Sequence, residues 1–132
     1  MGYNADAHLW YGVLLNKKQA LKLLKDNNIS VEVLDEEDDE YCSWTLKDNI
    51  DGALEDLVKP LKGVSLARTA YCEGDDVEPF EFGICTVQHN GDYYENKKIR
   101  LSSIDPSIKW TEAAKKLSIK GKGSWYLCAS YG

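Results

Sequence analysis

Residues 7–15 form the longest apolar run at the start of the chain. The run is long enough for a buried β-strand and much shorter than the roughly 20 residues of a membrane-spanning helix. Asn16 follows as the expected N-cap of a helix, and Gln19 stands three residues later, as in a capping box. Asn27 and Asn28 are expected to end this helix, because asparagine tolerates a left-handed backbone.

The middle of the chain is predicted to contain two short strands, one amphipathic helix and a further strand. Apolar residues alternate with polar ones over residues 29–33 and again over 42–46, which is the period of a half-buried strand. Residues 48–58 repeat apolar side chains at helical spacing, and Pro60 is expected to stop the helix. Residues 64–72 indicate the next strand.

The second half of the chain is predicted to form a hairpin, a third helix and a last strand. The dipeptide Asn90-Gly91 is typical of a two-residue type I′ turn, so residues 80–87 and 93–101 are expected to pair across it. The helix is expected over residues 105–117 and the last strand over 124–131.

The predicted elements follow the order βαββαβ and then ββαβ. The first part has the ferredoxin-like pattern. Helices on one face of a mainly antiparallel sheet make an α+β fold. A chain of 132 residues, 43% of them apolar, fits a single α+β domain over residues 1–132.

Charge is distributed unevenly along the chain, whose net charge is −6. Residues 35–81 carry 15 acidic and 4 basic side chains, a net charge of −11, whereas residues 89–132 have a net charge of +4. An acidic protein repels phosphate backbones at long range, so direct nucleic-acid binding is not expected. The acidic side chains predicted to bind a basic partner are Glu36, Glu37, Asp38, Asp39, Glu40, Glu73, Asp75 and Asp76.

Metal and cofactor sites have no signature in the sequence. The chain has no C-x-x-C pair, no EF-hand spacing and no glycine-rich phosphate motif, so neither a metal nor a cofactor is expected. Without an export signal or a membrane segment, a cytoplasmic location is expected. Four cysteines are interpreted as small, buried, reduced side chains: Cys42, Cys72, Cys85 and Cys128.

Catalytic candidates are limited to the two histidines, His8 and His89. Either one would need a nucleophile such as the thiolate of Cys85 or Cys128. No local motif supports such a pair. His8 is interpreted as a strand residue and His89 as an exposed turn residue, so binding is favoured over catalysis.

Aromatic residues occur as adjacent pairs at positions 10–11, 93–94 and 125–126. Side chains alternate across a strand, so each pair should place one ring on each face of the sheet. The rings on the face without helices need a second layer, a second copy of the chain as in a homodimer, or a ligand.

The two ends of the chain resemble those of small accessory proteins from phages and large DNA viruses. The resemblance is carried by residues 3–13 and 125–132 and includes no other part of the chain. It implies that the protein binds a host component, and that an acidic member of this class occupies a site meant for nucleic acid. No functional residue is carried over from it.

Three functions are therefore weighed. The first is a non-catalytic binding or inhibitor protein that engages a basic host protein through acidic loops and aromatic anchors. The second is a pocket that binds or cleaves a small ligand such as a nucleotide, with Lys97, Lys98 and Arg100 meeting the phosphates. The third is an enzyme that uses a histidine and a cysteine.

Overall fold

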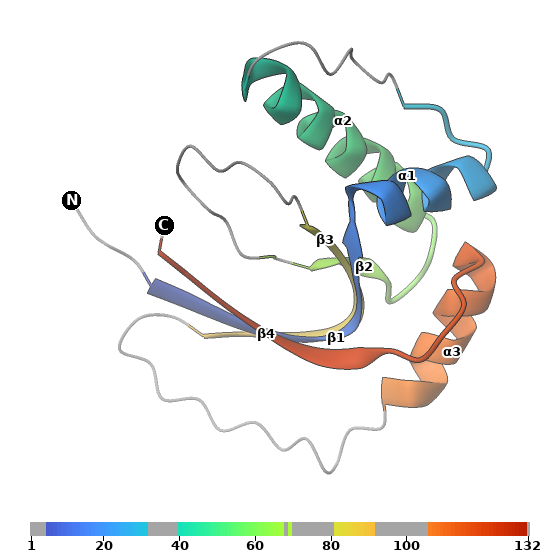
Figure 1. Cartoon of the computed structure of the whole chain (residues 1–132). Helices are drawn as coiled ribbons and strands as arrows, with labels where there is room; N and C mark the ends of the chain where they lie inside the picture. The colour runs from blue at the N-terminus through green and yellow to red at the C-terminus, as the bar shows by residue number, and fades with distance from the viewer. Residues whose placement is uncertain (1–4, 32–39, 68, 70–80, 92–105, 132) are drawn as a thin grey trace.

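The computed structural model describes residues 5–31, 40–67, 69, 81–91 and 106–131. Within these ranges the chain forms four strands and three helices, which are shown in Figure 1. In chain order the elements are β1 (Ala5–Asn16), α1 (Lys17–Asp26), α2 (Glu40–Val58), β2 (Ser65–Ala67), β3 (Glu81–Gly91), α3 (Pro106–Leu117) and β4 (Ser124–Tyr131).

The four strands form one sheet in the order β2-β3-β1-β4, and every neighbouring pair is antiparallel. Strands β1 and β2 are therefore parallel to each other with β3 between them, and β3 and β4 are parallel with β1 between them. Helices α1 and α2 connect the first parallel pair, and α3 connects the second. The α+β prediction is confirmed. The described elements run βααββαβ, which is the predicted βαββαβ order with a second helix between β1 and β2, and they extend over the whole described chain rather than its first half.

The junction between β1 and α1 is the predicted capping box. The side chain of Asn16 accepts from the amide of Gln19 at 2.8 Å, and the side chain of Gln19 accepts from the amide of Asn16 at 2.9 Å. These two bonds satisfy amide groups that a helix N-terminus otherwise leaves without a partner. They turn the chain directly from the strand into the helix.

The end of α1 rules out the strand predicted over residues 29–33, as far as those residues are described. Asn28 adopts a left-handed backbone with φ of 61°. Its amide donates to Lys25 O at 3.0 Å, and the amide of Ile29 donates to Leu24 O at 2.8 Å. These two bonds form a Schellman motif. Residues 29–31 are in no strand, and Ile29 and Val31 instead pack against the core beneath the helices.

The strand predicted over residues 42–46 is wrong, because these residues belong to α2, which begins at Glu40 rather than at residue 48. Buried side chains recur every four residues along this helix, at Leu46, Ile50, Leu54 and Val58. The helical period therefore starts earlier than the alternation of apolar and polar residues indicated. Packing of this buried stripe outweighs the local strand preference.

The predictions around β2 and β3 are confirmed in part. Of residues 64–72, the structure assigns Ser65–Ala67 to a strand. The hairpin turn at Asn90-Gly91 is wrong: β3 continues through both residues, which pair with His8 and Ala7 of β1. Pairing with β1 holds Asn90 and Gly91 in an extended conformation. The predicted return strand over residues 93–101 lies outside the described residues.

Helix α3 and strand β4 agree with the prediction, and α3 ends in a second Schellman motif. Ser118 has φ of 60°, and the amide of Ile119 donates to Ala114 O at 2.9 Å. The Nδ2 group of Asn27 donates to Leu117 O at 3.0 Å, so the ends of α1 and α3 are joined.

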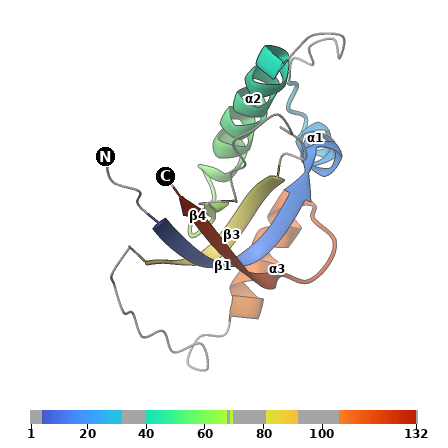
Figure 2. The same cartoon turned by 60° about the vertical axis from the view of Figure 1, so that its left-hand side comes forward.

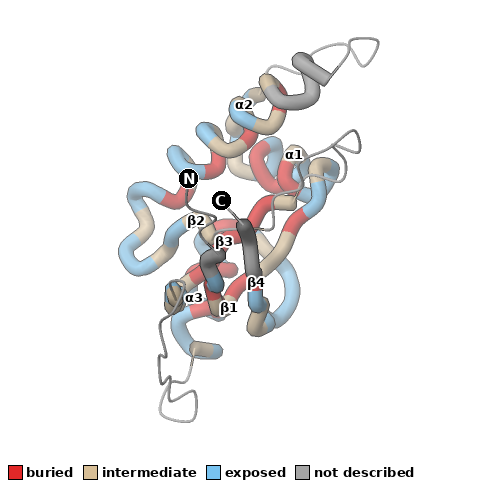
Figure 3. The backbone as a smooth tube through the Cα atoms, turned by 90° about the vertical axis from the view of Figure 1, so that its left-hand side faces the viewer, coloured by how far each residue is buried: buried red, intermediate tan, exposed pale blue. Residues whose placement is uncertain are grey.

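The core lies between the helices and one face of the sheet, which we name the helix face (Figure 2). Figure 3 shows buried positions recurring along all three helices and in β1 and β3. Because directly opposite residues share a face, the pairing register assigns Val13, Leu15, Phe82 and Ile84 to the helix face. The other side is named the open face, because none of the three helices packs on it.

The two described aromatic pairs divide between these faces as predicted. Tyr11 and Trp125 meet edge to face on the helix face, with ring centroids 5.3 Å apart. Trp10 and Tyr126 are stacked on the open face at 4.5 Å. None of the described helices is both long and apolar enough to pass through a bilayer.

Candidate functional site

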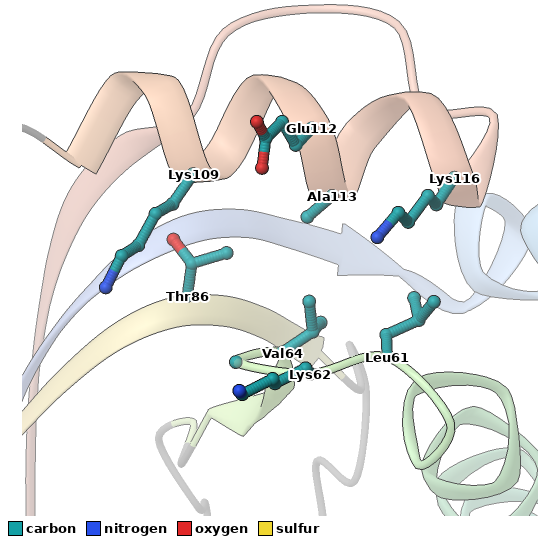
Figure 4. A pocket seen from close by; sticks show the side chains of 9 residues that line it. Leu61, Lys62, Val64, Thr86, Lys109, Glu112, Ala113 and Lys116 are labelled. Carbon is teal, nitrogen blue, oxygen red and sulfur yellow. The ribbon is translucent and has the colours of Figure 1, made fainter.

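A pocket of about 380 Å³ lies between α3, the turn that follows α2, and strand β3 (Figure 4). Three lysines, one glutamate and one threonine supply its polar groups, and small or aliphatic residues supply the rest. The lining residues are Leu61, Lys62, Gly63, Val64, Thr86, Lys109, Glu112, Ala113 and Lys116.

Helix α3 presents two of the lysines on one flank. Lys109 and Lys116 are seven residues apart, which is close to two helical turns, so they project on the same side. Ala113 lies between them and is buried against the sheet. The apolar stripe of α3 therefore packs the helix against the sheet, while its two lysines border the pocket.

The turn after α2 supplies the third lysine. The amide of Leu61 donates to Val58 O at 2.9 Å, and Gly63 adopts φ of 80°, which favours glycine. Leu61 and Val64 pack against the core and fix the turn at both ends. Lys62 between them is exposed and reaches the pocket rim (Figure 4).

Thr86 reaches the pocket through an irregularity in β3. Tyr11 pairs with Val87 and Gly12 pairs with Cys85, so Thr86 is an extra residue in the ladder. Such a β-bulge redirects the side chain of the extra residue. Figure 4 shows the hydroxyl of Thr86 directed toward α3. Its Oγ1 atom is buried and has no hydrogen-bond partner.

The electrostatics of the pocket favour an anion. Its four charged side chains are three lysines and Glu112, a formal charge of +2. Among the described residues, none of these four side chains forms an ion pair, whereas Lys47 and Asp51 of α2 form one at 2.7 Å. Three ammonium groups and one hydroxyl donor are therefore available to a ligand.

A second pocket of about 350 Å³ lies on the other flank of α3. Tyr11 and Trp110 contribute aromatic surface, and Lys115 and Lys122 contribute positive charge. The glycine-rich segment before β4 closes it: a side chain at Gly123 would meet Tyr11 at 2.5 Å, so the backbone there lies directly against the ring. Lysines therefore border both flanks of α3.

Of the acidic residues predicted to bind a partner, one lies within the described part of the chain: Glu40 is the first residue of α2. The other seven lie outside the described residues: Glu36, Glu37, Asp38, Asp39, Glu73, Asp75 and Asp76. The predicted phosphate-binding residues Lys97, Lys98 and Arg100 lie outside them as well.

The histidines and cysteines have definite places where they are described. His8 is buried in β1, and His89 is half-buried within β3, so its interpretation as an exposed turn residue is wrong. Cys85 and Cys128 are buried and form no disulfide, as expected. In the described part of the chain no three metal-binding side chains come together.

Sequence reasoning missed the residues of the pocket. The seven-residue spacing of Lys109 and Lys116 beside an apolar stripe was a usable signal for α3. Nothing in the sequence indicated Thr86, because its position depends on a bulge between two distant strands. Lys62 likewise reaches α3 only through the tertiary fold.

Compared with protein-family models, with curated proteins and with solved structures, the chain shows no significant match to any of the three. The class that the fold and the pocket define is an α+β protein with a lysine-lined pocket at the edge of an antiparallel sheet.

Proposed function

We propose that this protein binds a small phosphorylated molecule, such as a nucleotide, in the pocket between α3 and the turn after α2. The observation that carries the proposal is the meeting of three lysines without ion-pair partners and a buried hydroxyl without a hydrogen-bond partner. Lysine is a common binder of phosphate as a point charge. The hydroxyl group of Thr86 is buried and unpaired, so a hydrogen bond from it to a ligand oxygen adds to the affinity.

The size and the walls of the pocket narrow the ligand. A volume of about 380 Å³ is near the lower end of small-molecule sites. Leu61, Val64 and Ala113 offer apolar surface on which a flat ring can lie, while the lysines at the rim meet the phosphate. No histidine or cysteine lines the pocket, so the proposal is binding rather than cleavage.

Calorimetric titration with a nucleoside and its mono-, di- and triphosphates tests the proposal. We expect affinity to rise with phosphate number and to fall as salt increases, because the attraction is electrostatic. Lys116→Ala should weaken binding about tenfold, the value of one charge-assisted hydrogen bond of about 1.4 kcal/mol. Lys22→Ala is the matched control, since Lys22 is exposed on α1 away from the pocket.

Two results would refute this function. One is a nucleoside that binds as tightly as its phosphates. The other is an equal loss of affinity in Lys116→Ala and Lys22→Ala, which would indicate a general charge effect rather than a site.

A second candidate is the engagement of a basic partner protein by the acidic part of the chain. It is favoured by α2, which begins at the end of the acidic run and carries Asp48, Glu55 and Asp56 as exposed side chains. Co-purification with host proteins at low and high salt, with residues 36–40 changed to Gln and Asn, tests it. An unchanged set of partners in the neutralised variant would reject it.

A further inference from the structure

Two pockets of similar size lie on opposite flanks of helix α3. The first, of about 380 Å³, is the one between α3 and the turn after α2, and the second, of about 350 Å³, lies between α3 and the segment before β4. Both volumes fall in the range of small-molecule sites. An α-helix with its side chains is about 10–12 Å across, so the width of one helix separates the two pockets.

The second pocket combines apolar walls with positive charge. Tyr11, Ala114 and Ile119 contribute ring and aliphatic surface, and Tyr11 is half-buried, so part of its ring is accessible. Aromatic side chains are surfaces on which any nucleobase can stack. Lys115 and Lys122 are exposed, and within the described part of the chain neither forms an ion pair. A nucleobase and a phosphate group therefore both find complementary surface here.

Helix α3 directs neighbouring lysines to the two flanks. Lys109 and Lys116 line the first pocket and extend from the helix toward the sheet (Figure 4). Lys115 lines the second pocket. Consecutive residues of an α-helix are about 100° apart around its axis, so Lys115 and Lys116 lie on either side of the outer surface of α3. A phosphate on that surface is met by one ammonium group from each pocket.

The charge of the two pockets together exceeds what one nucleotide unit needs. They contain five lysines and one glutamate, a formal charge of +4, although the whole chain has a net charge of −6. Salt screens exposed charges over about 8 Å at physiological ionic strength, so nearby lysines outweigh distant acidic residues. A single nucleotide in the first pocket leaves Lys115 and Lys122 without a ligand.

We propose that the ligand is a dinucleotide, with one base in each pocket and the phosphodiester on the outer surface of α3 between Lys115 and Lys116. This inference rests on the proposed function, because the first pocket holds one of the two nucleotide units. Bases of an unpaired strand can be unstacked and splayed apart, as the helix between the pockets requires. The second base then binds intramolecularly, which raises the affinity without a stronger contact at the first site.

Calorimetric titration with a 5′-phosphorylated dinucleotide and with a nucleoside diphosphate tests the proposal. The two compounds carry the same formal charge and differ in the second base. We expect the dinucleotide to bind at least about tenfold more tightly. Lys115→Ala should reduce this preference about tenfold, whereas Lys116→Ala should weaken the binding of both compounds. Lys120→Ala is the matched control, because Lys120 is exposed beside the second pocket and lines neither pocket.

The indole group of Trp110 provides a local reporter of the second pocket. Trp110 lines that pocket, and its Nε1 group forms no hydrogen bond. The ¹H–¹⁵N signal of this group is assigned by its loss in Trp110→Phe. We expect one equivalent of the dinucleotide to shift the signal in the wild type, and the shift to be smaller in Lys115→Ala and with the nucleoside diphosphate.

Two results would overturn the dinucleotide and leave the proposed function standing. One is equal affinity for the dinucleotide and the nucleoside diphosphate, while Lys116→Ala still weakens binding of the latter. The other is a Trp110 signal that the bound dinucleotide does not move. Absence of binding by both compounds would overturn the proposed function and the dinucleotide together.

Discussion

Gly12 of β1 lies directly against the main chain of Ile84 in β3. A Cβ atom at Gly12 would overlap the carbonyl oxygen of Ile84 and approach Cα of Cys85 to 2.8 Å. The same position borders the bulge that sets Thr86 apart from the ladder. The close approach of two backbones and the placement of a pocket residue are thus parts of one local arrangement.

Gly12→Ala is therefore expected to lower the free energy of unfolding by about 1–3 kcal/mol or more, the cost of overpacking a tight site. Gly52→Ala is the matched control, because Gly52 is exposed in α2 and a Cβ there would meet nothing within 4 Å. That control should raise stability by about 1 kcal/mol through helix propensity. Urea unfolding measures both, and changes of the same sign would contradict the close approach.

Ser118→Gly is expected to raise stability by about 0.5–1 kcal/mol. Ser118 has φ of 60°, which costs a residue with a Cβ about 1–2 kcal/mol, while glycine loses about 0.4–1 kcal/mol more chain entropy on folding. Ser30→Gly serves for comparison, since Ser30 is exposed outside the left-handed region and should gain nothing. Thermal unfolding distinguishes them, and an unstable Ser118→Gly would show that the serine hydroxyl matters more than the backbone.

Thr86→Val is expected to make the ligand-free protein more stable and the ligand bind more weakly. Valine has nearly the same shape and removes a buried hydroxyl without a partner, a group that costs about 1–3 kcal/mol. Thr111→Val should do the opposite to stability, because it removes a bond of 2.8 Å to Ser107 O and does not border this pocket. Chemical denaturation and nucleotide titration of both variants provide the test. A less stable Thr86→Val would mean that the hydroxyl is already satisfied.

Stability should decline above about pH 9 in a manner that depends on Cys85. Burial raises the pKa of the Cys85 thiol above its ordinary value of 9.0, and the hydrogen bond with Ser65 opposes the shift in part. Above that pH the unfolded chain loses the proton while the folded protein keeps it. The stabilisation is therefore complete below pH 9 and falls with pH until the folded thiol also ionises, by at most about 1.4 kcal/mol per pH unit.

The check is urea unfolding from pH 7.5 to 10 in the wild type and in Cys85→Ala. The difference in free energy of unfolding between them should shrink as pH rises. A difference that is constant over the range would show that the thiol ionises equally in both states.

The local features of this fold were readable in the sequence. Asn16 and Gln19 specify a capping box through their own side chains, and residues 106–117 specify α3 through apolar spacing. Adjacent aromatic residues such as Trp10 and Tyr11 had to point to opposite faces, because a strand alternates its side chains. Each of these depends on residues a few positions apart, so the sequence alone determined them.

The tertiary structure decided what depends on distant partners. Residues 42–46 alternate like a strand, yet join α2 because Leu46 completes a stripe that the core buries. Asn90 could have formed a turn, but extended pairing with β1 placed it beside His8. The pocket between α3 and the turn after α2 arises in the same way. Its residues come from separate elements, and only the strand register and the helix packing bring them within reach of one another.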